Sequence, residues 1–174
     1  MMESVSPALE VRHLSKEELW QVRELALQIF PVTYQEIVEP EQIDYMMDLF
    51  YTPENLRKQY ESGQTFLIIY TEGKPSGYAS YTPLNENGEY KLNKIYVDTR
   101  QQGKGLGKNL INEVISLVGN AGGKSLQLNV NRFNKAVGFY KSMGFVIKKE
   151  ELLDIGKGYF MDDYVMEISI QSKA

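Results

Sequence analysis

The chain of 174 residues contains no cysteine, and its single histidine is His13. The lack of cysteine excludes disulfide bonds, catalysis by a thiol and zinc sites with cysteine ligands. One histidine cannot build a histidine-rich metal site, and we interpret His13 as a structural or surface residue. We therefore expect the protein to work without a metal ion.

Long apolar runs and clusters of basic residues are also missing. No stretch reaches the length of a transmembrane helix, and the N-terminus lacks the basic and apolar regions of a signal peptide. The formal net charge is −4, from 19 Lys and Arg against 23 Asp and Glu. We therefore expect no membrane binding and no nucleic-acid binding. The absence of cysteine fits a reducing compartment, and we expect a cytoplasmic protein.

Hydrophobic residues make up 43% of the chain, and no linker, repeat or low-complexity segment divides it. This length is ordinary for one domain, so residues 1–174 are predicted to form a single domain. Hydrophobic periodicity predicts strands over 9–14, 65–70, 76–81, 89–97, 125–130, 145–150 and 164–170. It predicts helices over 16–30, 40–50, 52–63 and 106–118, and one more after the strand that starts at 125. We expect Pro31 to end the first helix. The expected fold is α/β, with a mixed sheet and helices on both faces.

The most informative segment is Gly103-Lys104-Gly105-Leu106-Gly107-Lys108, between the strand 89–97 and the helix 106–118. Three glycines on alternate positions expose backbone N–H groups that side chains would otherwise cover. These N–H groups lie at a helix N-terminus, where unpaired donors and the helix dipole attract an anion. The two lysines add positive charge, so the segment predicts a pyrophosphate site.

Two familiar phosphate loops do not fit this segment. A Walker A loop would need glycine at Gln102 and Ser or Thr at Asn109. A dinucleotide-binding G-x-G-x-x-G pattern would need glycine at Lys108 or at Leu110, depending on the register. A glycine-rich turn that only caps a helix is the remaining structural alternative.

The spacing Arg100-x-x-Gly103-x-Gly105 resembles the acyl-CoA pyrophosphate loop of the GNAT superfamily of N-acetyltransferases. A second segment resembles the family's N-x-x-A-x-x-F-Y-x-x-x-G-F motif. It is carried by Asn134, Ala136 (shifted by the family's usual scatter), Phe139, Tyr140, Gly144 and Phe145. The resemblance extends over residues 66–170. It implies a mostly antiparallel sheet in which the fourth and fifth strands splay apart and hold acetyl-CoA.

The resemblance also implies which residues bind the cosubstrate. The backbone at the end of the fourth strand would pair with pantetheine, the glycine-rich loop would hold the diphosphate, and Asn134 would contact CoA while capping the last helix. The cofactor-binding residues expected in this way are Ile95, Tyr96, Val97, Gln102, Gly103, Lys104, Gly105, Leu106, Gly107, Lys108 and Asn134.

Tyr140 matches the family's tyrosine and is the expected catalytic residue. A neutral phenol, with a pKa of about 10, can protonate a departing thiolate, whose thiol has a pKa of about 8.5. The alternative is a core aromatic beside Phe139. Many relatives carry a glutamate base on the fourth strand, but residues 91–94 contain no carboxylate. A water chain or a carboxylate of the early loop could replace it: Glu36, Glu39, Glu41 or Asp44.

The acceptor is expected to be a small-molecule amine. Residues 30–60, which shape the acceptor site in this superfamily, combine carboxylates with aromatics, a chemistry that suits a polycation. The segment 154–166 resembles bacterial spermine/spermidine acetyltransferase-like members, which favours a polyamine. Asp162 and Asp163 could hold an amine there, or belong to a turn before the last strand.

Other functions remain open at this point. The acceptor could be a protein N-terminus, a lysine side chain or another small amine, and a non-catalytic acyl-CoA-binding or regulatory protein could keep the same loop. The presence of Tyr140 favours an enzyme. Many relatives form dimers through their closing strands, so the resemblance also allows a homodimer.

Overall fold

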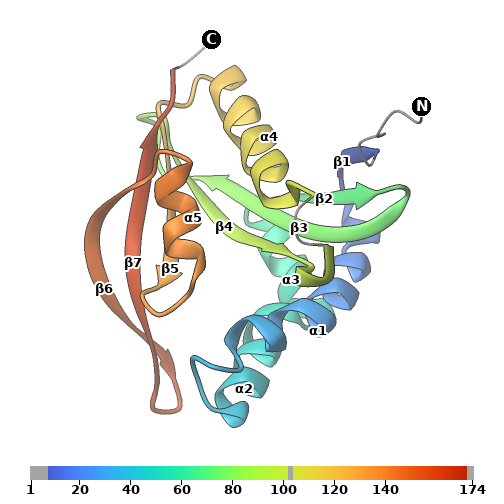
Figure 1. Ribbon diagram of the computed structural model, residues 1–174, viewed down its shortest axis with the longest axis vertical. Coiled ribbons are helices and arrows are strands. Elements are labelled where there is room, and N and C mark those ends of the chain that lie inside the picture. Colours follow the sequence, from blue (N-terminus) through green and yellow to red (C-terminus); the bar gives the residue numbers. More distant parts are fainter. Residues whose placement is uncertain (1–7, 102–103, 172–174) are drawn as a thin grey trace, which may run out of the picture.

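Figure 1 shows the computed structural model, which describes residues 8–101 and 104–171. Gln102 and Gly103, two of the expected cofactor-binding residues, lie outside the described residues. The strands are β1 (Leu9–His13), β2 (Thr65–Thr71), β3 (Lys74–Pro83), β4 (Glu89–Val97), β5 (Ser125–Asn131), β6 (Val146–Gly156) and β7 (Tyr159–Ser169). The helices are α1 (Trp20–Tyr34), α2 (Pro40–Tyr51), α3 (Pro53–Glu61), α4 (Leu106–Asn120) and α5 (Ala136–Ser142). Two short 3-10 helices, η1 (Lys16–Glu18) and η2 (Thr99–Gln101), precede α1 and α4.

The strands form one sheet in the order β1-β2-β3-β4-β5-β7-β6, and its two halves separate at the centre. Every neighbouring pair is antiparallel except β4 and β5, which are parallel. That parallel pairing stops at Leu92 on β4 and at Leu128 on β5. β4 then continues alongside β3 and β5 alongside β7, so the two strands diverge. The expected mostly antiparallel sheet with a splay between strands four and five is therefore confirmed.

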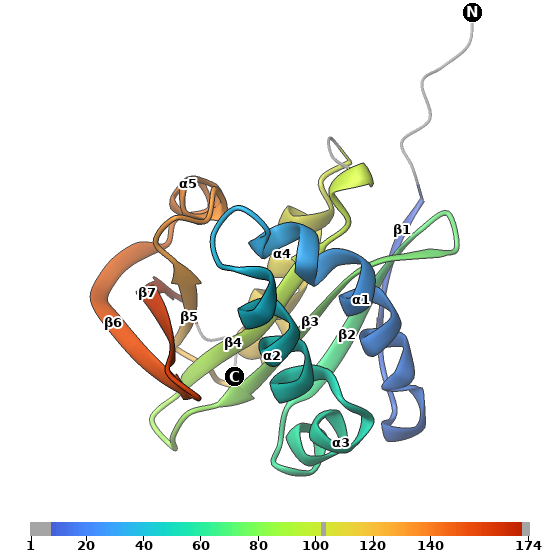
Figure 2. The same cartoon turned by 90° about the horizontal axis from the view of Figure 1, so that it is seen from below.

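Helices cover both faces of the sheet, as expected (Figure 2). Helices α1, α2 and α3 bury one apolar cluster against the sheet, which includes Phe30, Phe66 and Tyr78. Helices α4 and α5 bury a second cluster on the opposite face, which includes Leu110 and Met166. β2 lies between both layers, and this explains why its sequence is an apolar run instead of an alternating one.

The first helix does not end where the sequence predicted. We expected Pro31 to terminate it and residues 31–40 to form a loop, but α1 continues through Pro31 to Tyr34. Proline removes one backbone hydrogen bond and crowds the preceding turn. Here Phe30 and Tyr34 are both buried, and their rings lie 4.6 Å apart. Packing of these two aromatics outweighs the local preference of proline.

The two closing strands are longer than predicted. β6 and β7 form one hairpin whose turn contains Gly156, Lys157 and Gly158, all with positive φ. Asp162 and Asp163 therefore lie within β7, and the alternative that they belong to a turn before the last strand is wrong. Aspartate is unfavourable in strands in general, so local preference alone pointed to a turn.

Within the described ranges, no helix combines the length and apolar character needed to cross a bilayer. The same residues contain no group of three or more His, Cys, Asp or Glu side chains arranged to hold a metal ion.

Candidate active site

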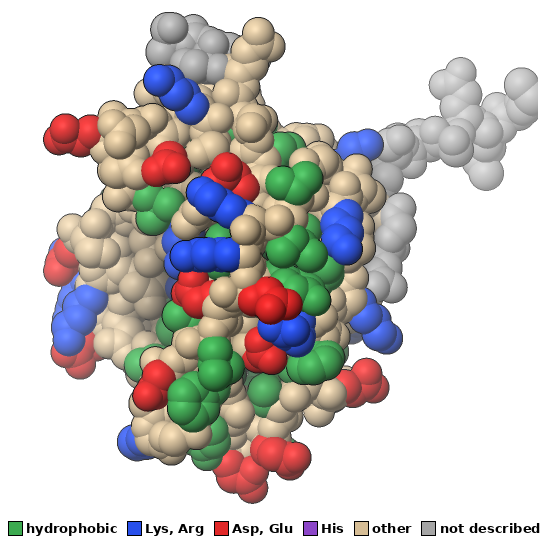
Figure 3. All heavy atoms as spheres, turned by 90° about the vertical axis from the view of Figure 1, so that its left-hand side faces the viewer, with side chains coloured by type: hydrophobic (Ala, Val, Ile, Leu, Met, Phe, Trp, Pro, Cys, Tyr) green, Lys and Arg blue, Asp and Glu red, His purple; other side chains and the backbone are tan. Residues whose placement is uncertain are grey.

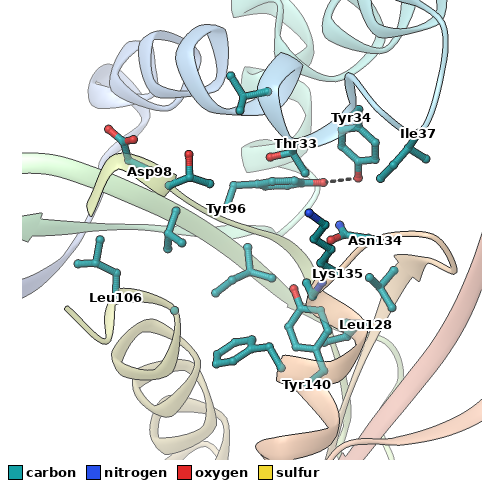
Figure 4. A pocket seen from close by; sticks show the side chains of 18 of the residues that line it. Thr33, Tyr34, Ile37, Tyr96, Asp98, Leu106, Leu128, Asn134, Lys135 and Tyr140 are labelled. Atoms are coloured by element: carbon teal, nitrogen blue, oxygen red, sulfur yellow. Dashed lines mark hydrogen bonds between the residues drawn. The ribbon is translucent and has the colours of Figure 1, made fainter. Parts of the chain in front are cut away.

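The divergence of β4 from β5 opens a cleft of about 820 Å³ (Figure 4). Its walls come from five elements that are far apart in the sequence: the end of α1, the second half of β4, the start of α4, the end of β5, and α5. The cleft lies between both apolar clusters, so the same opening reaches both faces of the sheet. This position follows directly from the register, because the cleft begins where the β4–β5 pairing ends.

The edge of β4 in the cleft carries backbone groups without a strand partner. Ile95, Tyr96 and Val97 line the cleft, and they pair with β3 on their other side. The backbone groups that point toward β5 beyond Leu92 have no β5 residue opposite them. Such an edge can accept an extended ligand in the way that a sheet accepts one more strand. The structure thus brings these three expected residues together in the cleft.

The N-terminus of α4 forms the second wall. Gly105 is its N-cap, with the left-handed values φ 71° and ψ 24°, a conformation that favours glycine. Gly105, Leu106, Gly107 and Lys108 all line the cleft. A β-carbon at Gly107 would approach the Phe139 ring to 3.3 Å, so glycine allows α4 to start close to α5. Backbone N–H groups of a first helical turn lack intrahelical acceptors, which makes this wall suited to an anion.

Lys104 and Arg100 shape the approach to α4. The Lys104 ammonium group donates to Oε1 of Gln101 over 2.7 Å. Arg100 is paired with the buried carboxylate of Asp98, at 2.8 Å, and also donates to Gln28 on α1. The motif arginine therefore ties the loop to α1, and Lys104 is an expected binding residue that the structure does not place in the lining of the cleft.

Tyr140 projects its hydroxyl group into the cleft from α5 (Figure 4). The side chain is only 6% exposed, and its ring contacts Phe139 and Phe145. Burial raises the pKa of the Tyr140 phenol well above its usual value, and the nearby Tyr34 raises it further. The phenol is therefore neutral at physiological pH and can donate a proton. The two interpretations of Tyr140, as a core aromatic and as a cleft residue, both hold.

Asn134 lies just before α5, whose N-cap residue is Lys135. Its Oδ1 accepts a hydrogen bond from the backbone N–H of Ala136 over 2.9 Å, which stabilises the first turn of α5. The residue also lines the cleft (Figure 4). Lys135 lies beside it in the lining and adds a positive charge that the sequence analysis did not single out.

A pair of tyrosines on the α1 side was missed by the sequence analysis. The hydroxyl groups of Tyr34 and Tyr96 lie 3.0 Å apart and are hydrogen-bonded (Figure 4). Burial raises the pKa of Tyr34 to about 12 and that of Tyr96 well above its usual value. The sequence predicted only a main-chain role for Tyr96. Nothing local shows that residue 34 would reach residue 96, since the contact depends on the continuation of α1 beyond Pro31.

The carboxylates considered as bases are mostly remote from the cleft. Glu36 lines its mouth and is exposed, whereas Glu39, Glu41 and Asp44 are exposed outside the lining. On β4, the side chain of Lys94 is buried, and its ammonium group lies 5.4 Å from the centre of the Tyr51 ring. The structure therefore brings no carboxylate of β4 to the cleft, in agreement with the sequence.

Comparison with known families resolves the identity of this arrangement. The family model described as an acetyltransferase (GNAT) domain matches residues 34–159, which contain most of the cleft. The chain belongs to the GNAT acetyltransferase family. The matched segment includes β4, the start of α4, and α5, the elements that carry the two sequence motifs.

Individual relatives agree with this assignment. The peptidyl-lysine N-acetyltransferase YjaB of Salmonella typhimurium is 33% identical over 96 residues, 54% of this chain and 59% of that protein. The chain spans about half the length of the curated relatives it matches. PaiA N-acetyltransferase from Thermoplasma acidophilum, solved in complex with coenzyme A, has a TM-score of 0.77 and 24% identity, covering 93% of this chain and 99% of that chain. The ribosomal-protein-S18-alanine N-acetyltransferase of Escherichia coli has a TM-score of 0.71 and 19% identity, covering 96% of each chain. The two structural likenesses show the fold alone.

Proposed function

We propose that residues 1–174 form a single acetyltransferase domain that transfers the acetyl group of acetyl-CoA to a primary amine by direct attack on the thioester. One observation carries the proposal: the unpaired edge of β4, the N-terminus of α4 and the Tyr140 hydroxyl group all face one cleft. These are a strand edge for an extended chain, an anion site and a proton donor. Together they match what acetyl transfer from acetyl-CoA requires.

The cosubstrate would bind along the cleft in two parts. Pantetheine would pair with the backbone at Ile95, Tyr96 and Val97, and the diphosphate would lie at the first turn of α4. Lys108 supplies positive charge within that turn, and Asn134 lies on the opposite wall. Gln102 and Gly103 belong to the same proposed loop, outside the described residues. The complex of PaiA with coenzyme A supports this choice of ligand class.

In the proposed reaction, the amine nitrogen attacks the thioester carbon and the carbon–sulfur bond breaks. Tyr140 donates its proton to the departing thiolate and regains one from the nitrogen. The raised pKa of Tyr140 means that the phenol carries its proton before the reaction begins. Positioning of the two substrates in the cleft supplies much of the remaining rate enhancement. The reaction as proposed needs no metal ion.

A polyamine is the acceptor we propose. Four exposed carboxylates lie between the end of α1 and the first half of α2, and the first of them lines the cleft: Glu36, Glu39, Glu41 and Asp44. Several separated negative charges suit an acceptor with several ammonium groups better than one with a single charge. The name of the relative YjaB makes lysine in a protein the alternative to test.

The decisive measurement is acetyl-CoA turnover, followed by thiol release, with spermidine, spermine, simple monoamines and lysine peptides. Faster turnover of polyamines than of monoamines would support the proposal in full. Preference for lysine peptides would support the acetyltransferase function and would change the acceptor from a polyamine to a lysine side chain of a protein. Calorimetric binding of acetyl-CoA without turnover of any amine would contradict the enzyme and favour a non-catalytic acyl-CoA-binding protein.

We propose a cytoplasmic location, because a chain without cysteine needs no oxidising compartment for disulfide bonds.

We also propose a homodimer that forms through β6. β6 is an edge strand, and exposed apolar side chains lie on its hairpin at Val146, Leu152 and Phe160. Figure 3 views this side of the molecule, where charges of both signs surround apolar groups. Light scattering after size-exclusion chromatography should give a dimer, and Leu152→Lys should shift it to a monomer. A monomeric native protein would contradict the dimer.

A further inference from the structure

The carboxylate of Asp163 lies buried beside the cleft, and no step of the proposed reaction uses it. Asp163 is 4% exposed and lies on β7, opposite Asn131 of β5. Met161, two positions earlier on the same strand, packs in the apolar cluster of α1 and α2. Because side chains alternate along a strand, Asp163 faces the same layer, which is the side where Tyr34 and Tyr96 lie.

Asn129 of β5 connects Asp163 to the cleft. The Nδ2 atom of Asn129 donates a hydrogen bond to Oδ2 of Asp163 over 3.3 Å, and Asn129 lines the cleft. A carboxylate only accepts hydrogen bonds, so the amide nitrogen has to face Asp163. Oδ1 of Asn129 takes no part in this bond, and an amide oxygen can accept a hydrogen bond from a group bound in the cleft.

The second oxygen of Asp163 needs a partner. Its Oδ1 is buried and has no hydrogen-bond partner among residues 8–101 and 104–171. A buried carboxylate oxygen without a partner is costly, and such atoms in native proteins call for an explanation such as a functional site. Asp163 itself does not line the cleft, so an ammonium group held beside Asn129 would act on this buried negative charge at a distance.

We propose that Asn129 and Asp163 form the subsite for the reacting amine of the acceptor. Oδ1 of Asn129 accepts a hydrogen bond from the nitrogen that attacks the thioester. Asp163 is a positioning residue that orients the Asn129 amide and attracts the ammonium form of the acceptor. The inference rests on the proposed acetyltransferase function, and it supplies the carboxylate on the acceptor side that β4 lacks.

The subsite should depend on pH through Asp163. Burial raises the pKa of the Asp163 carboxyl, the hydrogen bond from Asn129 lowers it, and nearby charges also act on it. Those charged groups are Glu151 of β6, Asp162 of β7 and Lys91 of β4, and Tyr34 of α1 faces the same carboxylate. Protonation at acidic pH removes the negative charge and frees the Asn129 amide to turn. Capture of the amine should therefore weaken as pH falls through the raised pKa.

The test compares Asp163→Asn with the native protein and with Glu167→Gln. The control removes one carboxylate from the same strand, where Glu167 pairs with Lys148. The assay uses acetyl-CoA and the fastest amine among spermidine, spermine and a lysine peptide. Loss of a charged interaction is worth roughly ten- to hundredfold, so KM for the amine should rise by at least about tenfold in Asp163→Asn. Acetyl-CoA affinity by calorimetry should stay unchanged, and Glu167→Gln should match the native protein.

The pH profile separates this role from a structural one. In the native protein, log kcat/KM for the amine should fall with decreasing pH. The slope against pH should be 1 where only the amine becomes protonated, and 2 at lower pH where Asp163 is also protonated. Asp163→Asn should keep slope 1 throughout. Asn129→Ala should raise the amine KM similarly, and the double variant should lose little more than either single variant because the two residues act as one unit.

Several outcomes would overturn the subsite. An unchanged amine KM in both single variants would overturn it, as would an equal loss of acetyl-CoA affinity, which would indicate a general structural defect. If all variants acetylated amines with native efficiency, the subsite would be contradicted, while the proposed acetyltransferase function would stand. Failure of the native protein to acetylate any amine would contradict both proposals.

Discussion

Introducing a negative charge at Gly105 should weaken acetyl-CoA binding through electrostatic repulsion. Gly105 caps α4 with φ 71° and lines the cleft where the diphosphate is proposed to bind. A β-carbon there would lie 3.3 Å from Nδ2 of Asn109, so a side chain fits after a small shift of a flexible amide. Aspartate and asparagine have nearly the same size, and both tolerate the left-handed region better than most residues. Comparing Gly105→Asp with Gly105→Asn therefore isolates the charge.

The size of the effect can be estimated from Coulomb's law. A carboxylate about 6 Å from two phosphate charges, in an effective dielectric constant of about 40 to 80, loses about 1.4 to 2.8 kcal/mol in total. This corresponds to a Kd for acetyl-CoA that is roughly ten- to hundredfold higher in Gly105→Asp than in Gly105→Asn. Both variants should also lose about 1 kcal/mol of folding stability, because a side chain in the left-handed region is strained.

Calorimetric titration with acetyl-CoA at low salt measures the difference, and a second titration at about 1 M salt tests its cause. Screening shortens the Debye length to about 3 Å at that concentration, so the two Kd values should converge. Equal Kd values for both variants at low salt would refute the placement of the diphosphate at α4. A difference that persists at high salt would refute the electrostatic explanation.

Three further predictions concern the tyrosines and Lys94. Tyr140→Phe should lower kcat by about a hundredfold or more while acetyl-CoA affinity stays the same, as measured by steady-state kinetics and calorimetry; unchanged kcat would exclude Tyr140 as the acid. Burial lowers the pKa of Lys94 from 10.5 to about 8, so the folded state binds fewer protons than the unfolded state between these values and stability rises with pH there. Lys94→Met should raise the free energy of unfolding at pH 7 by on the order of 3 kcal/mol and should remove its increase with pH. Denaturant unfolding at pH 7 and pH 10 tests this prediction, and an equal change in the free energy of unfolding between the two pH values in both proteins would contradict it. Tyr34→Phe and Tyr96→Phe should each cost about 1 kcal/mol of stability, and their double variant should cost less than the sum because both lose the same 3.0 Å hydrogen bond; additive losses would show that the bond contributes nothing.

The sequence was most informative where local chemistry and tertiary structure demand the same residues. The alternate glycines before α4 are required both for the left-handed cap at Gly105 and for the close approach of Gly107 to Phe139. The alternation of β5 likewise separates Leu128 from Asn129, which lie on opposite faces of the sheet. For these segments the pattern predicted the element, and the resemblance to the GNAT superfamily implied the cleft between the fourth and fifth strands.

Local preferences failed where burial overrode them. Pro31 predicted a helix end, yet α1 continues because Phe30 and Tyr34 gain more by packing than the helix loses at proline. A turn was one of the two alternatives for the aspartates at positions 162 and 163, yet they belong to a strand that pairs with a neighbour on each side. In both cases the deciding contacts come from residues far away in the sequence.

The sequence by itself determined the family, and it predicted the proposed phosphate loop and the proposed role of the tyrosine of α5, because each depends on residues adjacent in the chain. Only the tertiary structure decided which side chains share the cleft. The hydroxyl pair of Tyr34 and Tyr96, and the path from Asp163 through Asn129 into the cleft, join strands and helices that are separated by dozens of residues. Such contacts are fixed by sheet register and helix length, which local sequence patterns do not encode.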